Sequence, residues 1–410
     1  MSTAMQPFES GRTLPAKSLD FWFDYTCPYA YLGSTQARAL AARMNVPLTY
    51  RPLLLGGIFR ENGTPQKLFA TLSAAKAAHN MADMQRWAER FGVSLTMPPN
   101  HPIRSVEALR ATLTTKSDPR VIDAFYRAYW VDNADISSRE VVAQVVASCG
   151  HDAERVLAEM DSPAIKEDLR ARTNEAVSLG IFGVPAWIVD GAFLYWGQDR
   201  IHFVEGLPRS SAAALLHEPI DVYWDFSSPF AYLGAERVAG MNVRWHPILL
   251  GGLFRSIGAP DVPIATFSEA KRRYILEDLK RWAAYWGVPY RFPSRFPVMS
   301  LRAMRVYLAL PETRRDAYRA AVFRACWVDD RDITDDEVLA SCIDDETVAR
   351  EALAKANGDE VKAELRQSTE RAAERGVFGV PTFVVKGARG DELYWGQDRL
   401  ELALSSISRA

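Results

Sequence analysis

The pattern of apolar and polar positions predicts a strand, a helix and a second strand near the start of the chain. Residues 19–25 form a short apolar and aromatic run, which is typical of a buried strand. Pro28 then opens a helix that extends to about Met44, because a proline at the first helical position gives up no helical hydrogen bond. Residues 47–55 predict the second strand.

A block of helices and a closing hairpin complete this pattern. Residues 76–91, rich in alanine and methionine, repeat apolar positions with the period of a helix, and Gly92 ends it. The later elements are helices over residues 103–114, 119–131, 137–148 and 163–179, a hairpin of residues 186–189 and 193–195, and a short helix after Gln198 and Asp199. We therefore expect an α/β fold of the thioredoxin type with an all-helical insertion.

The same succession returns in the second half of the chain, where residues 221–226 predict its first strand. Four blocks recur in the same order, and collinear matches of this kind indicate a tandem duplication. The blocks are residues 23–33 and 224–234, 54–60 and 249–255, 180–185 and 376–381, and 194–200 and 393–399. We predict one domain over residues 18–210 and another over residues 219–410, with a linker near residues 207–219 in which residues 212–216 could extend a helix.

Charge and cysteine content exclude several classes of protein. With 49 basic and 51 acidic residues the net charge is −2, so nothing favours nucleic acid or an anionic membrane as a partner. The chain has no apolar run long enough to span a bilayer, and residues 1–18 lack the apolar core of a secretory signal. The four cysteines form no Cys-x-x-Cys pair and do not recur between the repeats, which argues against disulfides and zinc and for a reducing cytoplasm.

A candidate nucleophile-type residue occupies the first strand-to-helix turn of each repeat. It is Cys27 in the first repeat and Ser228 in the second, and each precedes the proline that starts the helix. The N-terminus of a helix offers unpaired N–H groups and the positive end of the helix dipole, which stabilise a thiolate or another anion. Two alternatives stay open: Ser228 as an ordinary helix cap, and Cys27 as a small buried apolar residue.

Two further features are predicted to converge on this turn. In thioredoxin folds a cis-proline precedes a strand and faces the turn, although the sequence leaves the isomer of the Val–Pro bonds open. A Gln-Asp pair at the start of the last helix can cap that helix or receive an amino group. The residues concerned are Val184, Pro185, Gln198 and Asp199 in the first repeat, and Val380, Pro381, Gln397 and Asp398 in the second.

Four motifs of the second repeat stand in a characteristic order. They are residues 225–232, a helix with Lys271, Tyr274, Asp278 and residues 281–283, then residues 377–383 and residues 395–399. Together they resemble the 2-hydroxychromene-2-carboxylate isomerase family, which belongs with kappa-class glutathione transferases and DsbA-type oxidoreductases. The resemblance covers nearly all of the second repeat and, more loosely, all of the first.

This resemblance implies a glutathione-dependent isomerase that acts on an unsaturated, aromatic small acid. The thiolate of glutathione would add reversibly to an unsaturated carbon, a bond would rotate or migrate, and the sulfur would leave. Ser228 would donate a hydrogen bond to that sulfur, while the tripeptide would be held along its length by Lys271, Val380, Pro381, Gln397 and Asp398. The matching positions of the first repeat are Cys27, Lys76, Val184, Pro185, Gln198 and Asp199.

The chain also departs from the family pattern. The family carries a Gly-Asn-x-Pro loop after the second strand, whereas residues 258–260 read Gly-Ala-Pro and residues 62–65 read Asn-Gly-Thr-Pro. The first repeat has His79 in place of Tyr274, which we interpret as a plain polar substitution. No second cysteine follows Cys27 in the turn, so an ordinary dithiol cycle is excluded.

Several alternatives therefore stand beside the isomerase. The chain could be a kappa-type transferase that consumes glutathione, a thiol–disulfide or glutathionylation module at Cys27, or an enzyme whose first repeat only packs. Because relatives of this kind commonly act as homodimers, the fused repeats would form an intramolecular pseudo-dimer. Lys76 and Lys271 could be ordinary surface lysines. Core positions are the expectation for Trp87, Trp130, Trp282 and Trp327.

Overall fold

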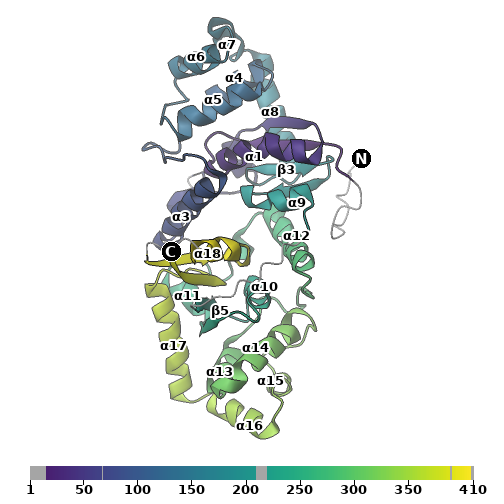
Figure 1. Ribbon diagram of the computed structural model, residues 1–410, viewed down its shortest axis with the longest axis vertical. Helices are drawn as coiled ribbons and strands as arrows, with labels where there is room; N and C mark the ends of the chain where they lie inside the picture. Colours follow the sequence, from purple (N-terminus) through teal and green to yellow (C-terminus); the bar gives the residue numbers. More distant parts are fainter. Residues whose placement is uncertain (1–14, 67, 209–218, 388–389, 408–410) are drawn as a thin grey trace. The chain divides into compact units, whose positions relative to one another are not determined.

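A computed structural model describes residues 15–66, 68–208, 219–387 and 390–407 (Figure 1). The described residues form two compact units. One contains those of residues 1–71, 81–208 and 267–274, and the other those of residues 72–80, 209–266 and 275–410. The predicted linker helix over residues 212–216 lies outside the described residues.

The units differ from the two sequence repeats in one respect. Residues 72–80 belong to the first repeat in sequence but to the second unit, and residues 267–274 belong to the second repeat but to the first unit. Both segments reach into the N-terminal part of a long helix, which is Ala74–Phe91 (α3) in the first repeat and Glu269–Trp286 (α12) in the second. The repeat pattern of the sequence gives no sign of this exchange.

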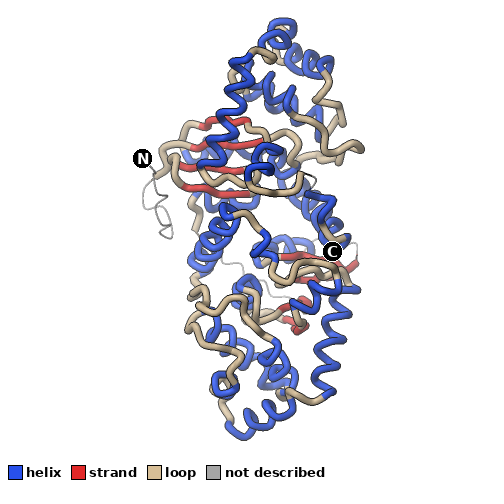
Figure 2. The backbone as a smooth tube through the Cα atoms, turned by 180° about the vertical axis from the view of Figure 1, so that it is seen from behind, coloured by secondary structure: helices blue, strands red, loops and turns tan. Residues whose placement is uncertain are grey.

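The sheet of the first repeat has the strand order β2-β1-β3-β4. Its strands are Leu19–Phe23 (β1), Leu48–Pro52 (β2), Ala186–Val189 (β3) and Phe193–Trp196 (β4). β1 pairs in parallel with β2 and antiparallel with β3, and β3 pairs antiparallel with β4 (Figure 2). The parallel pair needs a crossover, which the helix Pro28–Met44 (α1) supplies. The predicted order of these elements is confirmed.

Helices make up most of the rest of the first repeat, and α4, α6 and α8 pack together as part of the predicted helical insertion (Figure 1). The helices after α1 and α3 are Val106–Thr114 (α4), Pro119–Trp130 (α5), Arg139–Ser148 (α6), Ala153–Glu159 (α7), Pro163–Ser178 (α8) and Ile201–Glu205 (α9). Short 3-10 turns lie at Leu68–Thr71 and Gln198–Arg200.

Two short helices of this repeat were not predicted from the sequence. The prediction that the second strand reaches residue 55 is wrong, because Leu55–Glu61 forms a helix (α2) whose first N–H, from Leu55, donates to Oδ2 of Asp24 at 2.8 Å. The helix α7 begins where the side chain of Asp152 accepts the N–H of Arg155. Both helices are too short for an apolar period to reveal them.

The second repeat has the same topology, with the strand order β6-β5-β7-β8. Its strands are Ile220–Trp224 (β5), Val243–Pro247 (β6), Thr382–Gly387 (β7) and Gly390–Trp395 (β8). The helices besides α12 are Pro229–Arg237 (α10), Leu250–Ser256 (α11), Leu301–Ala309 (α13), Glu312–Trp327 (α14), Asp336–Ala340 (α15), Glu346–Lys355 (α16), Asp359–Glu374 (α17) and Leu400–Ile407 (α18). Two 3-10 turns lie at Pro263–Thr266 and Gln397–Arg399.

Buried tryptophans join the helical insertion of each repeat to its first strand. Trp130 and Trp327 are fully buried, and their indole N–H groups donate to the carbonyl of Tyr25 at 2.7 Å and of Phe226 at 2.9 Å. These carbonyls lie in the turn that follows β1 or β5, so helices α5 and α14 fix the position of that turn. The expected core positions of these tryptophans are confirmed, and Trp87 and Trp282 are buried as well.

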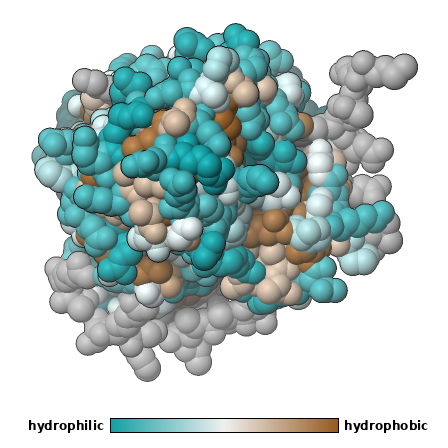
Figure 3. All heavy atoms as spheres, turned by 90° about the horizontal axis from the view of Figure 1, so that it is seen from above, coloured by the Kyte–Doolittle hydropathy of each residue, from teal (hydrophilic) through white to brown (hydrophobic). Residues whose placement is uncertain are grey.

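On the face drawn in Figure 3, hydrophobic residues lie in small groups among hydrophilic ones, the ordinary mixture for a globular protein. In the described part of the chain the exposed large apolar side chains are those of Phe69, Leu207 and Met299. None of the described helices combines the length and the apolar character that crossing a bilayer requires.

Candidate active site

Ser228 lies at the strand-to-helix turn of the second repeat, directly before the first residue of α10. It has the extended backbone of a helix cap, and its Oγ accepts the N–H of Ala231 at 3.2 Å. The same hydroxyl donates to the carbonyl of Val380 at 3.2 Å. Ser228 is therefore both a helix cap and a donor that faces the Val380–Pro381 loop.

Cys27 holds the matching position in the first repeat, but its chemistry differs. Its side chain makes no cap hydrogen bond, and its thiol donates to the carbonyl of Val184 at 3.0 Å. Burial raises the pKa of Cys27 to about 12, although the N–H groups of Ala30 and Tyr29 oppose that effect. At neutral pH the thiol is consequently protonated.

The loop that faces each turn contains a cis-proline. The bonds Val184–Pro185 and Val380–Pro381 are both cis, which resolves the isomer that the sequence left open. The helix approaches this loop closely at a glycine in each repeat. A Cβ atom on Gly234 would lie 2.9 Å from Cγ of Pro381, and one on Gly33 would lie 3.3 Å from Cγ of Pro185. Glycine at these positions therefore allows the turn and the cis-proline to meet.

A buried carboxylate supports each turn, and sequence reasoning did not single it out. Asp225 is fully buried, and its side chain accepts the N–H of Ser227 at 2.9 Å and the N–H of Leu250 at 2.6 Å. Burial raises the pKa of Asp225, and the hydrogen bonds from its neighbours oppose the rise. Asp24 has the same arrangement in the first repeat. An acidic residue at the end of an apolar strand, present in both repeats, was the available signal.

The Gln-Asp pair of the last helix divides into one packed residue and one partly accessible residue. Gln397 is buried, and its Oε1 accepts the indole N–H of Trp286 at 2.9 Å, while its carbonyl accepts from Arg237. Asp398 keeps 17% of its side chain exposed, with Oδ2 3.1 Å from the guanidinium of Arg399. Of this pair, the carboxylate of Asp398 is therefore the more exposed group.

The first repeat shows the same division. Gln198 is buried, whereas the Asp199 side chain is 13% exposed and lies 3.0 Å from the guanidinium of Arg200. In both repeats the pair thus combines a buried amide with a carboxylate that keeps part of its surface exposed. The sequence alone could not distinguish the two.

The two candidate lysines lie over tryptophans that stand two positions before the glutamines of these pairs. In the second unit, the Nζ of Lys76 is 5.3 Å from the ring centre of Trp395. In the first unit, the Nζ of Lys271 is 5.6 Å from the ring centre of Trp196. Their repeats group Lys271 with Ser228 and Lys76 with Cys27, but Lys76 lies in the unit of Ser228, because residues 72–80 pack there.

In the loop that differs from the family pattern, residues 62–65, the asparagine side chain bonds within its own helix. The Nδ2 of Asn62 donates to the carbonyl of Ile58 at 3.0 Å, at the end of α2. The side chain of Asn62 is therefore used at the end of its own helix. In the second repeat Ala259 offers only its backbone at this point.

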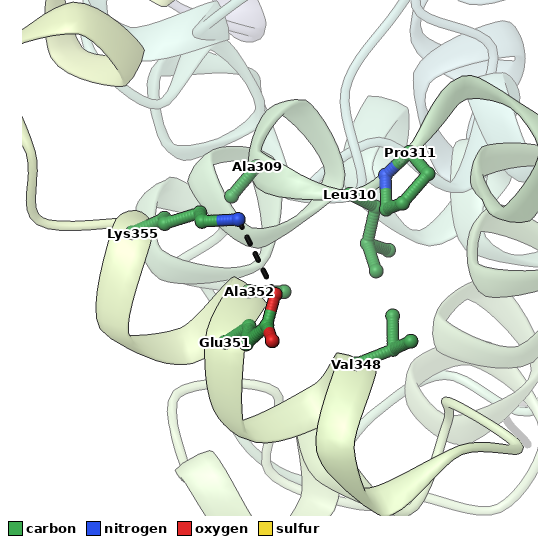
Figure 4. Close-up of a pocket in the computed structure, with 7 residues that line it drawn as sticks. All are labelled: Ala309, Leu310, Pro311, Val348, Glu351, Ala352 and Lys355. Carbon is green, nitrogen blue, oxygen red and sulfur yellow. Dashed lines mark hydrogen bonds and ion pairs between the residues drawn. The ribbon is translucent and has the colours of Figure 1, made fainter.

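The hollow shown in Figure 4 lies away from these turns. It is lined by residues 309–311 and by side chains of α16, where Lys355 pairs with Glu351 at 3.4 Å. None of the candidate residues lines it. Its lining combines apolar side chains with a surface ion pair whose two charges satisfy one another.

Comparison with known proteins agrees with the duplicated fold. The family described as DSBA-like thioredoxin domain matches residues 18–207 and again residues 219–408. A 2-hydroxychromene-2-carboxylate isomerase of Pseudomonas putida is 32% identical over 202 residues, which cover 46% of this chain and 94% of that protein. The corresponding isomerase of Sphingobium xenophagum is 29% identical over 197 residues, covering 46% and 97%.

Glutathione transferases are similar as well. The human glutathione S-transferase kappa 1 is 28% identical over 206 residues, covering 46% of this chain and 89% of that protein. Each relative therefore has the length of one repeat, as a tandem duplication requires. All of these relatives are enzymes, named as isomerases or as transferases.

Proposed function

Because the chain belongs to the DSBA-like thioredoxin domain family, we propose that it is a glutathione-dependent isomerase of an unsaturated, aromatic small acid. The names of its isomerase relatives support the reaction and the substrate class. The observation that carries the proposal is the hydroxyl of Ser228, which stands at a helix N-terminus and against the carbonyl of Val380. A hydroxyl donor beside the positive end of a helix suits a thiolate.

The described residues offer groups that match the charges of glutathione. The tripeptide carries two carboxylates and one ammonium group, and it would supply a thiolate that adds reversibly to an unsaturated carbon and is returned unchanged. Ser228 would donate to that sulfur, the Val380–Pro381 loop would run along the cysteinyl part, and Asp398 would receive the ammonium. Gln397, whose side chain is buried, would support the part of the chain that binds the γ-glutamyl end.

The direct test uses 2-hydroxychromene-2-carboxylate as the substrate, with and without glutathione. We expect isomer to form only when glutathione is present and the glutathione concentration to stay constant through many turnovers. Mass spectrometry of the product distinguishes the kappa-type transferase, because a conjugate gains the mass of glutathione and an isomer gains nothing. Equal turnover without glutathione would contradict the proposal.

The redox alternative at Cys27 is less well supported. A reactive cysteine needs a thiolate, and burial raises the pKa of Cys27 to about 12. No resolving cysteine stands beside it, since the turn continues with Pro28, Tyr29 and Ala30. We therefore assign the chemistry to the second repeat.

Alkylation of Cys27 by iodoacetamide should accordingly depend steeply on pH. A thiol with this pKa is less than about 1% ionised at pH 9, so the labelling rate should rise about tenfold per pH unit from pH 7 to pH 10. Peptide mass spectrometry measures it site by site, with Cys27→Ala as the control that identifies the labelled peptide. A rate that levels off near pH 8 would restore the redox alternative.

A further inference from the structure

The N-terminal part of α3 places two polar side chains against the block that begins at Trp395. Lys76 lies with its Nζ 5.3 Å from the ring centre of Trp395, and Nε2 of His79 accepts the backbone N–H of Trp395 at 3.1 Å. Residues three apart share one face of a helix, so both side chains reach the same target. His79 also packs against Phe378, with ring centres 5.3 Å apart. These contacts lie within the second unit, which includes residues 72–80.

The first unit has the reciprocal arrangement. The hydroxyl of Tyr274 accepts the backbone N–H of Trp196 at 2.9 Å, and Nζ of Lys271 is 5.6 Å from the ring centre of Trp196 and 4.1 Å from that of Phe267. Tyr274 packs against Phe182, with ring centres 5.5 Å apart. His79 and Tyr274, which stand at matching positions of the repeats, therefore share one role: each accepts the backbone N–H of a tryptophan. His79 is more than a plain polar replacement.

The ammonium group of Lys76 forms no ion pair with a described carboxylate. Its Nζ lies over the ring of Trp395. Burial lowers the pKa of Lys76, and no neighbouring charge opposes that effect. A partly buried ammonium gains more from a carboxylate than from an aromatic ring. This position therefore suits an anionic group of a ligand.

We propose that the two glutathione sites are completed by exchanged lysines. Lys76, from the first repeat, serves the site of Ser228 and Asp398, and Lys271, from the second repeat, serves the site of Cys27 and Asp199. The inference rests on the proposed use of glutathione. The γ-glutamyl end carries an ammonium and a carboxylate on the same carbon, so a site for it needs an anion and a cation together. Asp398 is the anion. Lys76 is the cation, because it lies over Trp395, three positions before Asp398.

The exchange can be tested by a double-mutant cycle on glutathione binding, measured by calorimetry on the full chain. Lys76→Gln should weaken one of the two sites by at least about tenfold, the scale of a lost hydrogen bond to a charged group. This effect should persist in an Asp199→Asn background and disappear in an Asp398→Asn background, because coupled residues are not additive. Lys271→Gln is the matched control, and its effect should disappear only with Asp199→Asn.

Two results would overturn the exchange: a Lys76→Gln effect that disappears with Asp199→Asn, or no effect in any background. Absence of glutathione binding in the unaltered chain would instead contradict the proposed function. A second measurement, which needs no glutathione, tests the packing of the N-terminal part of α3 against Trp395. Hydrogen–deuterium exchange of the Trp395 amide should rise at least about tenfold in His79→Ala and stay slow in His79→Tyr, which retains an acceptor. If hydrogen–deuterium exchange became faster at Trp196 in place of Trp395, the placement of Lys76 and His79 beside Trp395 would be wrong.

Discussion

Replacing Ser228 by alanine is expected to lower kcat/KM for the glutathione-dependent reaction by roughly tenfold to a hundredfold. The hydroxyl of Ser228 faces the carbonyl of Val380 and stands where the glutathione sulfur would bind. A hydrogen bond to a charged group contributes about 1.5–3 kcal/mol, which sets the size of the loss. The measurement is steady-state kinetics at saturating glutathione.

The controls separate chemistry from folding. Ser228 also caps α10, so its loss should reduce stability by about 1 kcal/mol, which thermal unfolding will report. Ser228→Thr keeps both the cap and the donor and should retain most activity. Cys27→Ala is the matched change in the first repeat and should leave kcat/KM within about twofold, because that thiol is protonated and makes no cap bond. Full activity of Ser228→Ala would exclude the proposed mechanism.

The largest effect on stability is expected from Asp225→Ala. The fully buried Asp225 side chain accepts the N–H groups of Ser227 and Leu250, and alanine would leave both without an acceptor. Each such loss costs about 1–3 kcal/mol, partly offset because a buried charge is removed, so we expect a net loss of roughly 3 kcal/mol. The bond to Leu250 also sets the start of α11, so the Ser228 turn should loosen.

Urea unfolding and hydrogen–deuterium exchange of the peptide around Leu250 measure this effect. Asp225→Asn retains one acceptor oxygen and should lose about half as much stability. Asp24→Ala is the matched variant of the first repeat and should speed exchange around Leu55 instead. If Asp225→Ala unfolds at the same urea concentration as the unaltered chain, Asp225 does not support the turn.

The sequence is a good guide to whatever depends on neighbours along the chain. The paired Phe/Trp, Asp and Pro positions of the repeats show the duplication, and the family matches confirm it. The apolar period and Pro28 predict α1 closely, since both ends of that helix are set locally. The turn residues Cys27 and Ser228 are visible for the same reason, because a proline marks the start of each following helix.

Other features depend on contacts between distant parts of the chain, and only the tertiary structure decides them. Burial keeps the thiol of Cys27 protonated. Packing brings the N–H of Leu250, the first residue of α11, to the carboxylate of Asp225. Packing of residues 72–80 sets Lys76 beside Trp395. The sequence by itself thus determines the duplicated thioredoxin scaffold and its candidate chemistry. The partners of each group follow from the fold, because burial and distance belong to the packed chain and leave no local pattern of residues.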